Sequence, residues 1–298
     1  PEDEKYTLPG FSILIAIVLT IICLAAFIYF IHNMSQSIQI NNILDTIFVK
    51  SKKRLNLLID KEAQDGLDII ESFPEVKDWH TYTTHQSGYF QNISLKNVIT
   101  ICKAYDTKAY LSIPKGFYVQ HHIPFLHTEK PLPDDVVEKL FSNINYSRSE
   151  FVEDNYVLAF KQITEIILKA MSPGINDPGT AINAIDYLTE LLALRMKKND
   201  SGVMVVEGEV HVRIAIVSFE ELLYNVMAAL RTYCAHDPLL VQKMIWMLAY
   251  LKDREEVSSE SYIEAINNEL AIVTQAAMDN ISNKTDLETI EKMSNNVS

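Results

Sequence analysis

A long apolar run near the start of the chain constrains it more than any other feature. Residues 11–31 read FSILIAIVLTIICLAAFIYFI and carry no charged side chain. About 20 such residues, rising about 1.5 Å each in a helix, span a hydrocarbon core of about 30 Å. A secretory signal peptide would place a shorter apolar segment after basic residues, whereas residues 2–4 are acidic. The sequence therefore predicts a transmembrane helix.

The charges that flank this run predict its orientation. Acidic residues dominate the segment before it, and the first basic cluster after it consists of Lys50, Lys52, Lys53 and Arg54. Because lysine and arginine collect on the cytoplasmic side, we expect an inner (cytoplasmic) membrane protein with its C-terminal domain in the cytoplasm. Alternatively, the basic cluster binds anionic lipid headgroups. Membrane lipids are the expected partners in either case.

Composition narrows the class of protein further. The formal net charge of −13 argues against nucleic-acid binding, which needs a basic face. The three cysteines, Cys23, Cys102 and Cys234, have no close spacing, so they predict neither a disulfide framework nor a zinc pattern.

The chain begins at Pro1 without an initiator methionine, so we expect it to be trimmed or to lack an earlier part. One helix cannot enclose a pore, so a pore would need a homo-oligomer or upstream helices.

The expected fold class is helix-rich α+β. No proline or glycine interrupts residues 11–65, so the membrane helix is predicted to continue into a stalk. Strands at 89–93, 109–113 and 117–119, with a helix at 95–105, predict a small β-α-β-β module. The chain then becomes mainly helical, with one β-hairpin at 203–217. The predicted division is a transmembrane helix at 1–32, a helical stalk at 33–70, the small module at 71–130, a helical domain at 131–282 and a frayed polar tail at 283–298.

Helix starts have their own local signals. Ser94, Ser218 and Asp237 are suited to cap helices that begin one residue later. Ser218 belongs to a capping box with Glu221, and Asp237 is followed by a proline at the first helical position.

The densest local motif is SPGINDPGTAI, at residues 172–182. Gly174 is expected to adopt a positive φ at a turn, and Asp177 is expected to cap a helix whose first residue is Pro178. Backbone N–H groups at this helix start could hold an anion, but the Asp177 carboxylate would compete for them. The motif therefore predicts a tight corner between two helices.

Polar residues then recur every three or four positions along the helix that Pro178 opens. They predict either a capped corner with a solvated helix face, or a stripe that lines a ligand or ion site between helices or subunits. The stripe consists of Asp177, Thr180, Asn183, Asp186 or Tyr187, and Glu190. The candidate ligand-binding or interface residues are Ser172, Gly174, Asn176, Asp177, Thr180, Asn183 and Asp186.

The same motif resembles the S-P-G-x-N-D-P-x-T-A signature of DUF2254, a family of bacterial membrane proteins for which no activity is established. The resemblance extends to residues 30–32, 87–91 and 116–119, and so covers nearly the whole chain. Gly179 departs from the family pattern, which usually has a large aromatic residue there. The resemblance implies several hydrophobic segments upstream, with this chain as the last membrane helix plus the cytoplasmic region.

Other candidate sites carry weaker signals. Five histidines, His80, His85, His121, His122 and His127, fall in the small module. They show neither the helical i,i+4 spacing nor the cysteine pair of common metal motifs, so surface or pH-sensitive roles are preferred and no metal ligand is assigned. No P-loop, dinucleotide fingerprint or nucleophile elbow occurs, so no catalytic residue or cofactor is assigned.

The sequence thus favours a homo-oligomeric membrane protein that passes or regulates ions or small solutes, because an acidic vestibule would concentrate cations. The alternative is a membrane-anchored ligand sensor or scaffold without transport. An enzyme that uses the corner at Asn176 and Asp177 is the least favoured of the three.

Overall fold

The computed structural model describes residues 10–37, 40–65, 73–148, 155–254 and 259–297. The chain divides into two compact units, residues 1–46 and residues 47–298, which are described separately. In the first unit, α1 (Gly10–Ser37) holds the apolar run as one helix. Residues 10–31 of α1 are long and apolar enough to cross a membrane. The Thr20 hydroxyl donates to the Ala16 carbonyl at 2.7 Å, so this polar group has a partner within the helix.

The second helix, α2 (Ile40–Asp65), begins after residues 38–39, which lie outside the described residues. The long predicted helix is thus described in two pieces. From Ile47 onward, α2 belongs to the second unit. Ile47, Ser51 and Leu55 recur every four residues and are buried, so they form the face that packs on the rest of the unit.

Two small sheets share one hydrophobic core. The larger sheet has the order β1-β5-β3-β8-β7 and is antiparallel except where β3 pairs with β8. Ala109 pairs with Val212 in that parallel register, so the hairpin predicted from the sequence completes the sheet of the small module. The strands are β1 (His80–Thr83), β3 (Ala109–Leu111), β5 (Pro124–Thr128), β7 (Val203–Val206) and β8 (Glu209–Ile214).

The smaller sheet has the order β4-β2-β6, all antiparallel. It consists of β2 (Gly88–Ile93), β4 (Tyr118–Val119) and β6 (Ile144–Ser147). Two amphipathic helices, α4 (Leu95–Ala104) and α5 (Asp134–Ser142), add their apolar faces to the shared core. β3 and β4 flank residues 114–116 but enter different sheets, and β6 lies beyond residue 130. The division into domains at these boundaries therefore stays a prediction.

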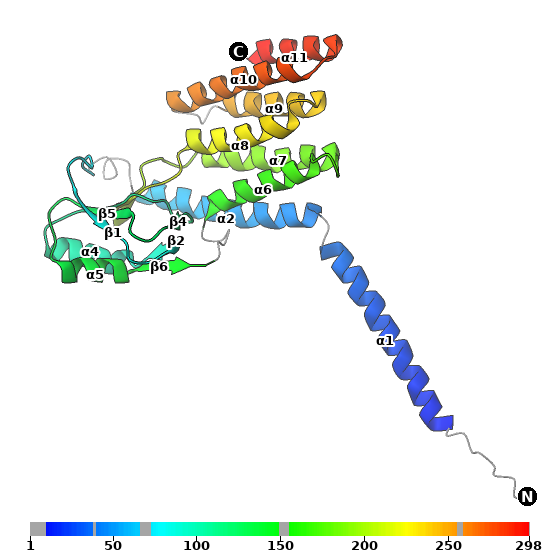
Figure 1. Cartoon of the computed structure of the whole chain (residues 1–298), viewed down its shortest axis with the longest axis horizontal. Helices are drawn as coiled ribbons and strands as arrows, with labels where there is room; N and C mark the ends of the chain where they lie inside the picture. Colours follow the sequence, from blue (N-terminus) through cyan, green and yellow to red (C-terminus); the bar gives the residue numbers. More distant parts are fainter. Residues whose placement is uncertain (1–9, 38–39, 66–72, 149–154, 255–258, 298) are drawn as a thin grey trace, which may run out of the picture. The chain divides into compact units, whose positions relative to one another are not determined.

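The remaining helices lie side by side and form the helical body (Figure 1). Contacts join α6 to α7, α7 to α9, and α9 to both α10 and α11. Leu188 of α7 and Met244 and Leu248 of α9 are fully buried in this body. The helices are α6 (Tyr156–Ala170), α7 (Pro178–Arg195), α8 (Phe219–Cys234), α9 (Pro238–Lys252), α10 (Glu260–Asn280) and α11 (Lys284–Val297).

Side-chain caps confirm most of the predicted helix starts. Ser218 accepts from the Glu221 N–H at 3.1 Å, and Asp237 accepts from the N–H groups of Leu239 and Leu240 at 2.9 and 3.1 Å. Ser94 occupies the predicted N-cap position of α4, but its side chain makes no cap hydrogen bond.

The expectation of a frayed tail is wrong. Residues 284–297 form α11, in which Ile290 is fully buried. The Thr274 hydroxyl of α10 donates to the Ser294 hydroxyl at 2.9 Å, and Lys252 Nζ of α9 donates to the Val297 carbonyl at 2.6 Å. A polar sequence thus packs as a helix because a few residues on one face contact α9 and α10.

Candidate functional site

The SPGINDP motif forms a hydrogen-bonded corner between α6 and α7. The Ser172 hydroxyl donates to the Lys169 carbonyl at 2.7 Å, and the Ser172 carbonyl accepts from the N–H groups of Ile175 and Asn176, each at 3.0 Å. The Asp177 N–H then donates to the Ala170 carbonyl at 2.8 Å, which closes the corner. The predicted tight helix–turn–helix corner is confirmed.

The residue with a positive φ in this corner is Asn176, at 48°, and not Gly174. The expectation for Gly174 is therefore wrong. Asparagine is one of the few residues with a side chain that adopts the left-handed region without a large penalty. A Cβ added at Gly174 would meet no heavy atom within 4 Å, so this position demands neither the flexibility of glycine nor its small size.

The Asp177 carboxylate caps α7 as predicted, and both of its oxygens are engaged by Thr180. The Thr180 N–H donates to Asp177 Oδ1 at 3.1 Å, and the Thr180 hydroxyl donates to Oδ2 at 2.6 Å. These bonds, the hydroxyl first and the backbone N–H second, hold the pKa of Asp177 below its usual value. A carboxylate fixed at this helix start competes with any external anion for the same N–H groups.

Asp186 lies farther along α7 and has a partner on another helix. Its carboxylate forms an ion pair with Lys243 of α9, and Lys243 Nζ lies 4.5 Å from the centre of the Trp246 ring. The structure therefore joins Asp177 to Thr180 and directs Asp186 toward α9. Ser172, Gly174 and Asn176 belong to the corner itself, and Asn183 lies on α7 between Thr180 and Asp186.

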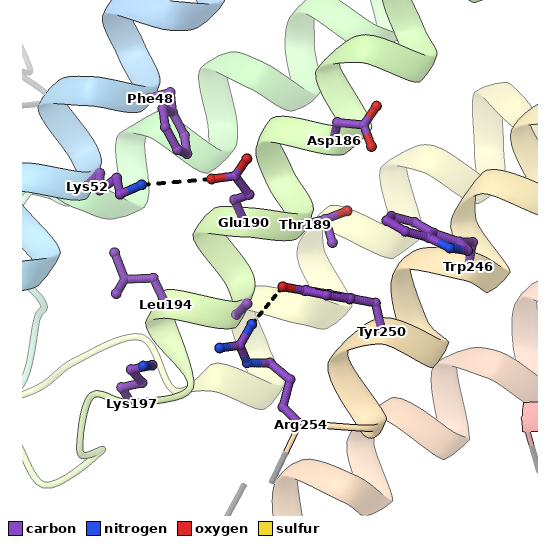
Figure 2. A pocket seen from close by; sticks show the side chains of 11 residues that line it. Phe48, Lys52, Asp186, Thr189, Glu190, Leu194, Lys197, Trp246, Tyr250 and Arg254 are labelled. Atoms are coloured by element: carbon purple, nitrogen blue, oxygen red, sulfur yellow. Dashed lines mark hydrogen bonds and ion pairs between the residues drawn. The ribbon is translucent and has the colours of Figure 1, made fainter. Parts of the chain in front are cut away.

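A hollow of about 500 Å³ lies between α2, α7 and α9, and Asp186 is the candidate residue that lines it (Figure 2). Glu190, also in the predicted stripe, faces it one turn later. The lining residues are Phe48, Lys52, Asp186, Thr189, Glu190, Ala193, Leu194, Lys197, Trp246, Tyr250 and Arg254.

The walls of this hollow combine charges with aromatic faces. Lys52 of α2 lies 3.8 Å from Glu190, and Arg254 Nη1 donates to the Tyr250 hydroxyl at 2.7 Å (Figure 2). The Trp246 and Tyr250 rings are stacked at 5.7 Å. The Arg254 guanidinium lies 5.5 Å from the centre of the Tyr250 ring, so the lining places a cation against an aromatic face, as in sites that take a small charged solute with a flat apolar part.

The comparisons with known proteins give the family. A family described as "Predicted membrane protein (DUF2254)" matches residues 1–250.

The chain belongs to the DUF2254 family.

Relatives of this DUF2254 chain include uncharacterised proteins of Mycobacterium bovis and Mycobacterium tuberculosis. Each is 22% identical to this chain over 294 residues, which cover 96% of this chain and 56% of the relative. The chain thus spans about half the length of the curated relatives it matches. No solved structure matches it. Membership in a family of predicted membrane proteins agrees with the candidate membrane span in α1.

In this DUF2254 chain, the part of the hollow that sequence reasoning missed is the α9 wall. Trp246 is 46% exposed and faces the hollow. Lys243, Trp246 and Tyr250 follow one another at steps of three or four residues, which places them on one face of α9, and Arg254 follows just beyond the end of that helix. This spacing, with two aromatic residues between two cations, was the available signal.

Proposed function

We propose that this chain is the membrane-exit helix and ligand-responsive body of a homo-oligomeric inner-membrane protein that passes or regulates ions or small solutes. The observation that carries the proposal is that α2 contributes residues to the lining of the hollow. Phe48 and Lys52 of α2 line it together with α7 and α9. Because α2 is the helix that follows α1 in the chain, a solute bound there would contact the helix that comes after the membrane segment in the sequence.

Charge supports the proposed orientation and solute class. The basic cluster at 50–54 favours a cytoplasmic body, and the acidic net charge of −13 would raise the local concentration of cations near it. In this proposal the membrane pathway is formed by several copies of the protein, because the one candidate span among the described residues does not enclose a pore by itself.

A second candidate function is ligand sensing or scaffolding without transport. The observation that favours it is that the hollow is formed within residues 47–298 alone. A solute can be bound there without any pathway through the membrane.

Reconstitution separates the two functions. Liposomes that are loaded with KCl and contain the full protein are expected to release K⁺ faster than protein-free liposomes loaded in the same way. The mass of the protein in mild detergent is expected to exceed that of one copy. Trp246→Ala should change the flux while thermal unfolding of the protein stays cooperative. If liposomes show no flux, but an anionic probe such as ATP or a cationic probe such as spermidine quenches Trp246 fluorescence in a Trp79→Phe background, sensing replaces transport as the function.

A further inference from the structure

Three histidines from two separate loops meet at one end of the β1–β5 pair. His85 follows β1, whereas His121 and His122 precede β5. Thr83 pairs with Pro124 in the antiparallel register, and two further backbone bonds extend this pairing beyond the strands. The His122 N–H donates to the Thr84 carbonyl at 2.9 Å, and the Thr84 N–H donates to the Ile123 carbonyl at 3.2 Å.

The imidazoles are close enough to act together. One ring nitrogen from each of His85, His121 and His122 lies within 4.8 Å of the other two. The ring centres of His121 and His122 are 3.8 Å apart, and that of His85 lies 5.6 Å from His122 and 6.2 Å from His121. All three side chains are exposed, so an ion from solvent reaches them directly.

The backbone around His85 is fixed on both sides. Thr84 is buried, and its hydroxyl oxygen accepts from the Gln86 N–H at 3.1 Å. The same hydroxyl lies 3.2 Å from the Tyr146 hydroxyl of β6. The loop is therefore held in place before any ion binds, which lowers the entropy lost on binding.

We propose that His85, His121 and His122 bind one divalent transition-metal ion of the kind that prefers imidazole, with Zn²⁺ as the representative. Imidazole nitrogen suits Zn²⁺, Ni²⁺ and Cu²⁺, whereas Mg²⁺ and Ca²⁺ prefer oxygen ligands. Zn–N bonds of about 2.0–2.1 Å need the nitrogens slightly closer together, and exposed side chains reach that spacing by small rotations. Three protein ligands leave a fourth position for water or an external ligand.

The proposal is independent of the solute pathway, because the histidines lie in the sheet region and not in the hollow. A bound ion would join the loop after β1 to the turn before β5. The ion would therefore stabilise the folded state by an amount that grows with the ratio of its free concentration to its dissociation constant.

Metal titration of the full chain in detergent, purified without a histidine tag, tests this. Isothermal titration with Zn²⁺ is expected to give one site per chain, with a dissociation constant of about 10 μM or tighter. Co²⁺ is expected to give the visible absorption of a four-coordinate site, and Zn²⁺ should raise the melting temperature.

Substitution identifies the ligands. The double variant His85→Ala/His121→Ala should weaken Zn²⁺ binding about 100-fold or more and lose the Co²⁺ absorption. His80→Ala is the matched control, since His80 is an exposed histidine of the same segment outside the cluster, and it should bind as the wild type does. The melting temperatures of the metal-free proteins show whether each variant is folded. Equal Zn²⁺ binding by the wild type and the folded double variant, or no binding by the wild type, would overturn the proposal.

Discussion

The buried ammonium of Lys198 donates to Glu62 Oε1 at 2.7 Å, so an ion pair joins the end of α2 to the segment that follows α7. Glu62 Oε2 accepts from the Asn199 N–H at 2.8 Å, so both carboxylate oxygens are engaged. Burial lowers the pKa of Lys198, and the Glu62 carboxylate opposes that shift. The neighbouring Arg195 is fully buried and donates to the carbonyls of Lys198 and Val217, each at 3.0 Å.

Removal of the Glu62 charge should therefore destabilise the second unit. Glu62→Gln leaves a buried ammonium without its counter-charge, and we expect a loss of about 2 kcal/mol in the free energy of unfolding, measured by urea denaturation. Glu190→Gln is the matched control, because its pair with Lys52 is exposed and should contribute about 0.5 kcal/mol or less. Equal losses in the two variants would contradict the anchoring role of Glu62.

The pH dependence of the Glu62→Gln variant has a definite sign. The folded-state pKa of Lys198 lies below the ordinary value of 10.5, so the unfolded state binds more protons as the pH approaches that value. The stability of the variant should thus rise with pH in the alkaline window below 10.5, more than that of the wild type. A flat profile in this window would show that Lys198 finds another counter-charge.

The Asp177 cap predicts a graded set of stabilities. Asp177→Ala removes the acceptor for the Thr180 N–H and should lower the melting temperature by about 2–4 °C, whereas Asp177→Asn keeps an acceptor and should lower it much less. If both variants lost function equally while their melting temperatures matched the wild type, the carboxylate charge would have a chemical role instead.

The charge of Asp177 also predicts a contribution to the stability of the folded state that is lost in acid. Its folded-state pKa is below the ordinary 3.8, so the stabilisation is complete above that value and is lost as the pH falls through the folded-state pKa. The difference in melting temperature between the wild type and Asp177→Asn should accordingly shrink below about pH 4. A difference that persisted at lower pH would not come from this ionisation.

The corner allows a test of which residue needs the left-handed conformation. Asn176→Ala should destabilise the protein by about 1 kcal/mol, because alanine has a Cβ but no polar side chain that could stabilise a positive φ. Asn176→Gly should be tolerated, because glycine has no Cβ and adopts a positive φ readily. Gly174→Ala should have little effect, since its added Cβ meets no neighbour. Chemical denaturation of the three variants measures the order, and a larger loss at Gly174 than at Asn176 would contradict it.

These examples show what local sequence signals supply. Asp177, Ser218 and Asp237 cap helices as predicted because a cap depends on residues within one turn. The left-handed residue was misassigned because both glycine and asparagine adopt that conformation, and the choice between them depends on the bonds at Ser172 and Ala170. Motif letters alone do not contain that information.

Long-range pairings were beyond the reach of sequence patterns. The parallel pairing of Ala109 with Val212 joins segments that are far apart in the chain, and no local pattern specifies a strand partner. The same holds for the approach of His85 to His121, which depends on the register of β1 against β5. The wall of the hollow on α9 was missed for the same reason, because it faces residues of α2 and α7 that only the packing identifies.

The membrane span predicts the behaviour of a truncated chain. Deletion of residues 1–30 removes most of the apolar run and should release the rest from washed membranes, whereas the full chain should require detergent. Fractionation followed by immunoblotting measures this. A truncated chain that still pellets would indicate a second membrane contact, for which the basic residues at 50–54 are the first candidates.

The polar stripe on α7 gives the prediction that bears most directly on function. Thr180 has a bonding partner in Asp177, and Asp186 has one in Lys243, so these two side chains of the stripe already have partners within the chain.

If the stripe is a solvated face, the Thr180→Ala/Asn183→Ala variant should keep the wild-type oligomer mass and flux, with a change of no more than about 1 kcal/mol in stability. If it is an interface, as the proposed homo-oligomer favours, the same variant should shift the mass in light scattering while its circular dichroism stays that of a folded chain. Asp186→Asn, which loses the ion pair to Lys243 at the edge of the hollow, should alter flux without altering mass. A monomeric wild type in mild detergent, together with a double variant that behaves as the wild type does, would exclude both the interface and the pore and leave the anchored sensor as the function.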